Sequence, residues 1–147
     1  MVGVEVAGCS LCESDGGVLV FKNDQLRVIQ AVEEGFPAFY RVVWNAHVAE
    51  FSSLSAGDRS TCMNAVVAVE QVLREVLLPT KINLAALGNA VPHLHWHVIA
   101  RFDWDSHFPG SVWAAPQRQV NLQKLAHLAL QCEQVNHLLA VKLKLDF

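Results

Sequence analysis

The sequence lacks the features that mark several large classes of protein. Its 11 basic residues form no block and its net charge is −3, which argues against a nucleic-acid polymer as the main partner. It contains neither a Walker-type glycine-rich loop nor a lysine-rich clamp, which argues against a kinase or a P-loop enzyme. No apolar run reaches the roughly 18 residues of a transmembrane helix. Residues 1–5 lack the basic start of a signal peptide. We therefore expect a cytoplasmic protein with no membrane partner.

Cysteine is also scarce, with four residues in a chain of 147. Cys9 and Cys12 form a C-x-x-C pair ahead of any predicted strand, whereas a thioredoxin-like redox pair opens a helix that follows a strand. The pair is either half of a zinc site, which needs two further ligands, or two buried thiols that merely pack. Cys62 and Cys132 fall in helical patterns and are expected to be small core residues.

Apolar residues, in contrast, are plentiful and make up 52% of the chain. A chain of this length suits one domain (residues 1–147), which buries roughly two thirds of its unfolded surface. The apolar fraction is high for a monomer and indicates a subunit interface.

The most informative segment is 93–99, which reads His-Leu-His-Trp-His-Val-Ile. Alternate side chains of a β-strand share a face, so His93, His95 and His97 are expected on one face, with the intervening apolar residues in the core. Strands with one wet face ordinarily place Thr, Lys, Glu or Ser there, not a row of imidazoles.

Three interpretations of this histidine row compete. It is a solvated strand face, a metal site of the His-x-His type, or a nucleophilic site in which one imidazole attacks while its neighbours orient it. No Asp or Glu lies between Glu75 and Asp103, so the flanking sequence offers no nearby acidic ligand for a catalytic metal. Nucleophilic catalysis is therefore favoured.

With φ for an apolar residue, segment 93–99 is His-φ-His-φ-His-φ-φ, and Arg101 follows it. This pattern resembles the signature of the histidine triad (HIT) superfamily of nucleotide hydrolases and transferases, and the resemblance covers about three quarters of the chain. It implies cleavage at the α-phosphate of a diadenosine polyphosphate or a nucleoside phosphoramidate through a nucleotidyl-histidine intermediate. By this resemblance His95 is the nucleophile, and His93 and His97 complete the polar cluster around the phosphates.

The resemblance also implies a structural zinc ion. Family members with an N-terminal C-x-x-C bind zinc through both cysteines, a histidine after the central strand and the first triad histidine. The matching positions are Cys9, Cys12, His47 and His93, a set suited to tetrahedral zinc. No organic cofactor is implied. The implied partners are a purine nucleotide or dinucleotide substrate and a second copy of the chain in a homodimer.

Other positions match the family less closely. Asn83 aligns with an amide residue that contacts the nucleotide, and Asn89 stands where relatives carry Gln; the alternative for either is a turn or strand-end residue. Ala90, Phe39 and Ala100 stand where relatives often have a hydroxyl residue, a histidine and a proline. The histidine replaced by Phe39 orients the triad in relatives. Two other functions therefore stay open: a low-turnover nucleotide-binding module, and a metal-dependent hydrolase that uses the histidine row as ligands.

The hydrophobic pattern predicts an α+β fold of the HIT type. The expected strands cover residues 18–21, 26–29, 39–44, 82–87 and 93–99. They would form an antiparallel meander, with a long helix from Ser52 to Pro79 packed on one face, in a core of about residues 9–113. Residues 114–147 would form a C-terminal helical extension. Residues 102–113, rich in aromatic side chains, would either wall the nucleotide pocket or cross a dimer interface.

Overall fold

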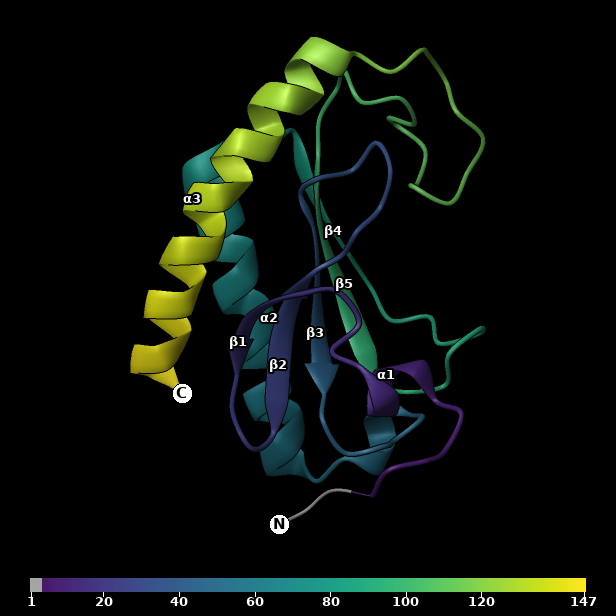
Figure 1. Cartoon of the computed structure of the whole chain (residues 1–147), viewed down its shortest axis with the longest axis vertical. Helices are drawn as coiled ribbons and strands as arrows, with labels where there is room; N and C mark the ends of the chain where they lie inside the picture. The colour runs from purple at the N-terminus through teal and green to yellow at the C-terminus, as the bar shows by residue number, and fades with distance from the viewer. Residues whose placement is uncertain (1–3) are drawn as a thin grey trace.

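The computed structural model describes residues 4–147 (Figure 1). Residues 1–3, part of the segment in which no signal peptide is expected, lie outside the described residues. The strands are β1 (Val18–Lys22), β2 (Leu26–Gln30), β3 (Phe39–Trp44), β4 (Lys81–Ala85) and β5 (His95–Arg101). They form one antiparallel sheet in the order β1-β2-β3-β5-β4. The predicted α+β class and antiparallel sheet are confirmed.

The sheet departs from a strict meander at its far end. The chain leaves β3, crosses one face of the sheet as a helix and lands at the edge as β4, so that β5 returns into the gap between β3 and β4. β5 therefore pairs on both sides, and its residues from 97 to 101 are buried. This central place suits the run of apolar residues after the last histidine.

Helix α2 (Ala56–Leu77) is the helix that crosses the sheet. The Ser55 side chain caps its start by accepting a hydrogen bond from the Asp58 amide at 3.1 Å. The helix ends at Leu78, whose φ of 48° is left-handed. A longer helix was predicted, but its first residues form the 3-10 turn η1 (Phe51–Ser53), because the cap lies beyond them.

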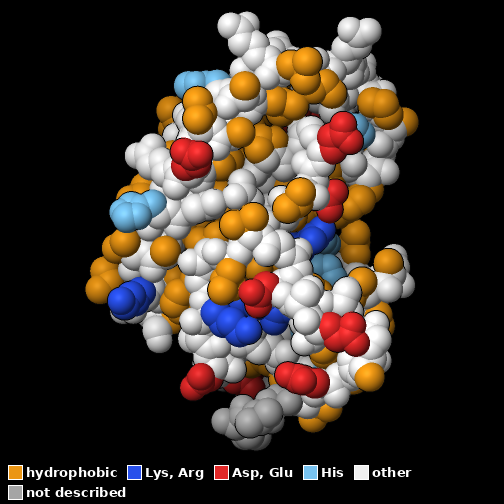
Figure 2. Space-filling view, viewed as in Figure 1, with side chains coloured by type: hydrophobic (Ala, Val, Ile, Leu, Met, Phe, Trp, Pro, Cys, Tyr) orange, Lys and Arg blue, Asp and Glu red, His pale blue; other side chains and the backbone are white. Residues whose placement is uncertain are grey.

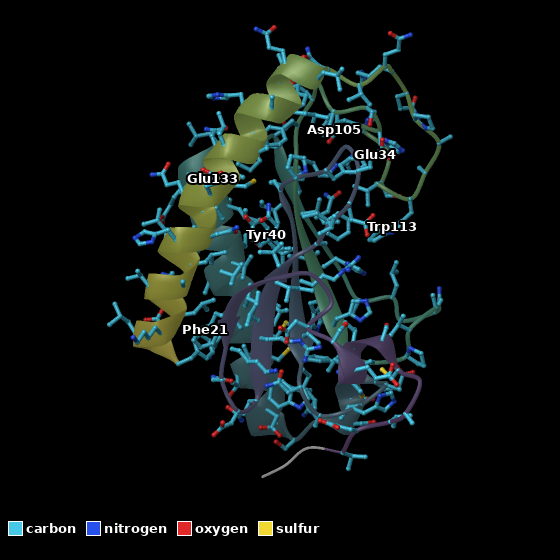
Figure 3. All side chains as sticks on the ribbon, viewed as in Figure 1. Phe21, Glu34, Tyr40, Asp105, Trp113 and Glu133 are labelled. Atoms are coloured by element: carbon cyan, nitrogen blue, oxygen red, sulfur yellow. The ribbon has the colours of Figure 1, made fainter. Side chains whose placement is uncertain are left out.

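Helix α3 (Leu122–Asp146) is a single continuous helix in the predicted C-terminal extension, of which residues 114–121 are not helical. It packs beside α2 and β1 and buries a stripe of Leu128, Cys132, Val135, Leu139 and Leu143. A polar contact fixes it to the sheet: the Tyr40 hydroxyl donates to the Asn136 side chain at 2.7 Å. Figure 3 shows Tyr40 between the sheet and α3. None of the helices within residues 4–147 is both long and apolar enough to cross a membrane.

The two faces of the sheet have different surroundings, because side chains alternate along each strand. The even-numbered residues of β3 and β5 pack with α2 and α3 in the main core, which also buries Cys62 and Cys132 as predicted. The odd-numbered residues point to the opposite face, where His95, His97 and Arg41 line a cavity. Figure 1 shows α2 and α3 on the side of the sheet away from α1 (Ser10–Glu13).

A buried ion pair fastens residues 102–113 to the sheet. Arg101 Nε and Nη2 lie 2.8 and 3.0 Å from the two carboxylate oxygens of Asp105, and both side chains are at most 5% exposed. Arg101 also donates to the Gly110 carbonyl at 2.7 Å and to the Asn83 side chain at 2.9 Å. Each nitrogen of the Arg101 guanidinium therefore has a hydrogen-bond acceptor, and the side chain holds this loop against the sheet.

The Asp105→Asn variant is expected to lose about 3 kcal/mol of unfolding free energy at pH 7, because it leaves Arg101 buried without a counter-charge. Burial by itself raises the pKa of Asp105, but hydrogen bonds from Arg101 and from the Phe102 and His107 amides outweigh it, and the pKa lies below its usual value. The contribution of the carboxylate is therefore present above the unfolded-state pKa of about 3.9 and is lost as the pH falls through the lower folded-state pKa. Urea unfolding at pH 7 and at acid pH measures both effects. The exposed Asp103→Asn control should change stability by less than about 0.5 kcal/mol; an equal loss in both variants would contradict the assignment.

Candidate active site and metal centre

His95 opens β5 with one ring nitrogen already engaged. Its Nδ1 lies 2.6 Å from the His93 carbonyl oxygen. A carbonyl only accepts hydrogen bonds, so Nδ1 carries the proton and Nε2 of the neutral ring carries the lone pair. Burial lowers the pKa of His95 and the charge of Arg41 lowers it further, against the opposing effect of the bond to His93. The ring is therefore neutral near pH 7, with Nε2 as its nucleophilic atom.

His97 has the opposite tautomer. Arg41 Nε lies 3.3 Å from His97 Nδ1, and a guanidinium can only donate, so Nδ1 accepts and Nε2 bears the proton. Burial, with His95 and Arg41 nearby, lowers the pKa of His97 to about 3. The two rings meet edge to face with centroids 4.9 Å apart. The pair thus combines a lone pair on one ring with an N–H donor on the other.

Both histidines line a cavity of about 490 Å³, within the range of small-ligand sites. Arg41, Asn89 and Trp113 also line it, together with residues of α1. The Trp113 ring lies 5.1 Å from the His97 ring and is half exposed, so this part of the 102–113 loop forms a wall of the cavity. Figure 3 shows Trp113 on the side of the sheet away from α3.

Of the two asparagines predicted to bind substrate, the structure brings one to this cavity. Asn89 is among the lining residues, in the segment between β4 and β5. Asn83 lies in β4, opposite Ile99, and its side-chain oxygen accepts the hydrogen bond from Arg101. Asn83 is outside the cavity lining.

His93 lies just before β5 and is not among the residues that line the cavity, so the strand carries two of the three histidines. β5 starts at His95, because the chain before it makes a tight turn in which the His93 amide bonds to the Val91 carbonyl at 2.8 Å. The fully buried His93 ring is directed at the cysteine pair. Its Nε2 donates to the Trp44 carbonyl at 2.6 Å, which leaves Nδ1 unprotonated.

The four predicted metal ligands do come together. The ligand atoms of Cys9, Cys12, His47 and His93 all lie within 4.8 Å of one another. His93 Nδ1 lies 3.4 Å from Cys9 Sγ and 3.5 Å from Cys12 Sγ, and His47 Nδ1 lies 3.4 Å from Cys12 Sγ. Ligands of a tetrahedral zinc ion, bonded at about 2.3 Å to sulfur and about 2.0–2.1 Å to nitrogen, are separated by about 3.5 Å. The cluster therefore fits a Cys2His2 metal site.

His93 links this cluster to the nucleophile candidate. Its ring faces the cysteines while its carbonyl holds the Nδ1–H of His95. A bound metal would thus fix the residue that sets the His95 tautomer.

Arg41 is a site residue that the sequence pattern did not reveal. It lies in β3 directly opposite His97, in a strand otherwise made of apolar residues and one tyrosine. A single arginine on the same strand face as Phe39 was the available signal, but its meaning depends on the β3–β5 register. Phe39 itself packs edge to face on His97 at 5.4 Å.

The profile of the HIT domain family matches residues 14–104 of the chain, which include this site apart from residues 9–12 and Trp113. The chain belongs to the HIT family. A search of curated proteins found no match. Solved structures of HIT proteins share the fold, and a histidine triad protein from Bradyrhizobium japonicum is 24% identical, covering 82% of this chain and 90% of its own, with a TM-score of 0.65.

Two further structures extend this comparison. A histidine triad protein from Marinobacter aquaeolei VT8 is 22% identical, with 93% of this chain and 99% of its own covered and a TM-score of 0.69. A hypothetical histidine triad nucleotide-binding protein from Sulfolobus tokodaii is 14% identical, with coverage of 84% and 85% and a TM-score of 0.57. At these identities the likeness shows that the HIT protein has the family fold.

Proposed function

We propose that this HIT protein cleaves a nucleotide at its α-phosphate, with a diadenosine polyphosphate or a nucleoside phosphoramidate as substrate. One observation carries the proposal: the cavity is lined by a neutral His95 whose Nδ1–H is held by a carbonyl, which leaves the Nε2 lone pair for attack. Membership of the HIT family supports nucleotide chemistry in general, and the S. tokodaii relative carries the name nucleotide-binding protein.

The reaction has two steps. His95 Nε2 donates its lone pair to the α-phosphorus as the bond to the leaving group breaks, and the leaving group takes the bonding electrons. The positive charge that develops on the His95 ring is stabilised by the Nδ1–H bond to the His93 carbonyl. Water then attacks the phosphorus, the P–N bond breaks and its electrons return to Nε2, while the water loses a proton to solvent. The products are a nucleoside monophosphate and the leaving group.

His97 serves the first step as a hydrogen-bond donor. Its Nε2–H is the side of the ring not occupied by Arg41, and it lies beside the nucleophile. It would donate to an oxygen of the phosphate or to the leaving group. A zinc ion would be held by Cys9, Cys12, His47 and His93. It would fix the position of the His93 ring next to the active site and would take no part in making or breaking bonds.

The substrate proposal is tested by a screen with product identification. Diadenosine tetraphosphate and adenosine phosphoramidate are incubated with the protein in ¹⁸O-labelled water, before and after chelation, beside a metal assay. We expect the label on the phosphate of the released adenosine monophosphate, with turnover that persists in folded protein after chelation. Binding without turnover would instead favour a nucleotide-binding module, which the Phe39 replacement makes the second candidate.

We also propose a homodimer. β4 is an edge strand of the sheet, and edge strands without a partner chain are open to pairing. Leu84 and Leu87, in and after β4, are 45% and 52% exposed. Figure 2 shows further apolar side chains spread over the face that includes α3. Together these apolar groups are the kind of surface that subunit association buries.

Light scattering is expected to give about twice the 16.2 kDa mass of one chain at micromolar concentration. The Leu84→Lys variant places a charge on the exposed edge and should shift the population towards monomers. The exposed Leu130→Lys control tests whether α3 contributes to the interface instead. A monomeric mass for the wild-type protein would refute the dimer.

A further inference from the structure

Arg41 is a charged residue in direct contact with the triad, and its guanidinium is held from two sides. Nε donates to His97 Nδ1 at 3.3 Å, and Nη2 donates to the Glu33 carboxylate at 3.0 Å. The group also lies over the Phe39 ring, with Cζ 5.2 Å from its centroid. The Arg41 side chain is 20% exposed and Glu33 is 45% exposed, so the arginine is fixed while its partner carboxylate is within reach of solvent.

Arg41 also provides the positive charge of the cavity. No other Lys or Arg lines the cavity within residues 4–147. Nε and Nη2 are the nitrogens that hydrogen-bond within the described chain, which leaves Nη1 for a ligand. A phosphate group has two or three charged oxygens, which an arginine matches better than a neutral imidazole does.

We propose that Arg41 binds a phosphate of the substrate and at the same time sets the His97 tautomer, with Glu33 holding the guanidinium until a phosphate arrives. This inference rests on the proposed function for the identity of the substrate, although not for the binding of phosphate itself. Arg41 keeps the proton of His97 on Nε2, so that the ring donates into the cavity. Loss of Arg41 would remove the cation and release His97 to populate the other tautomer.

The first experiment measures pyrophosphate binding by titration calorimetry, without any turnover. Arg41→Met should weaken binding about 10- to 100-fold, as expected for the loss of charged hydrogen bonds. Arg41→Lys should lie between it and the wild type, since an ammonium keeps the charge but not the planar fork. Arg74→Met, an exposed position on α2, is the matched control and should bind as the wild type. Wild-type protein that does not bind pyrophosphate, or Arg41→Met that binds it equally well, would overturn the proposal.

The second experiment reads the tautomer directly. The ¹⁵N chemical shifts of the His97 ring should show an unprotonated Nδ1 and a protonated Nε2 in the wild type, and a mixture of the two tautomers in Arg41→Met. An unchanged ring in that variant would contradict the positioning role. This readout is specific, because a general loss of stability would not change the tautomer of the His97 ring at neutral pH.

A further variant leaves Arg41 in place and therefore tests the proposal even if the Arg41 variants fail to fold. Glu33→Gln, on an exposed loop, removes the carboxylate that competes for Arg41 and should tighten pyrophosphate binding about threefold. Unchanged or weaker binding would contradict the holding role. Failure of the proposed function looks different: pyrophosphate binding would depend on Arg41 while no nucleotide is turned over.

Discussion

Replacement of His95 by alanine is expected to lower turnover of the nucleotide substrate by four to six powers of ten, roughly the loss seen when a catalytic nucleophile is removed. Once His95 is removed, His97 presents a proton rather than a lone pair at Nε2, so it cannot replace the nucleophile. His95→Asn keeps a polar group of smaller size and should lose the same activity. Nucleotide binding should be weakened far less than turnover, because affinity comes from the remaining contacts in the cavity.

Rapid quench makes this test decisive. Wild-type protein mixed with a substrate labelled at the α-phosphorus should trap acid-labile label on the protein, and both His95 variants should trap none. His97→Ala should lower turnover about 100-fold while still forming the labelled intermediate, since it supports the attack rather than making it. His127→Ala, an exposed histidine of α3, is the matched control and should be fully active. A His95→Ala variant with near wild-type turnover would end the nucleotidyl-histidine hypothesis.

The Cys12→Ser variant is expected to lose its metal and at least about 4 kcal/mol of stability, the linkage free energy of a ligand present at about 1,000 times its dissociation constant. Cys12 Sγ lies within 3.5 Å of both histidine ligands, so its loss opens the cluster on two sides. Metal analysis of protein purified without chelator should find about one zinc per chain in the wild type. Chelation should lower the melting temperature of the wild type but leave that of Cys12→Ser unchanged.

Cys62→Ala separates the metal from general packing. Cys62 is fully buried in the main core, away from the cluster, so this variant should keep its zinc while it loses a small amount of stability. Wild-type protein without metal, combined with a Cys12→Ser variant of unchanged stability, would show that the zinc site does not exist.

Loss of zinc is also expected to reduce the rate without abolishing the chemistry in protein that stays folded. The metal would immobilise the His93 ring, and the His93 carbonyl sets the His95 tautomer, so the effect on the nucleophile is indirect. Activity that vanishes with the metal, returns on its addition and never produces a labelled protein would instead identify a metal-dependent hydrolase.

Much of this protein was determined by local sequence. The strands follow from alternation and apolar runs over a few residues, and the start of α2 from one serine cap, which are properties of short segments. The family pattern also predicted the grouping of Cys9, Cys12, His47 and His93, which the structure confirms. The nucleophile role of His95 stays a prediction from the same pattern.

Only the tertiary structure decided which side chains meet at the site, because their positions depend on strand register and on turns of the chain. The sequence pattern placed His93 in one strand with His95 and His97, but β5 starts at His95, after a turn in which the His93 amide bonds to the Val91 carbonyl, and the His93 ring contacts the cysteines. Arg41 reached the site only because β3 pairs with β5 in the register that sets it opposite His97. Pairing between strands more than fifty residues apart is fixed by the core on the far face of the sheet, and no short segment of sequence contains that information.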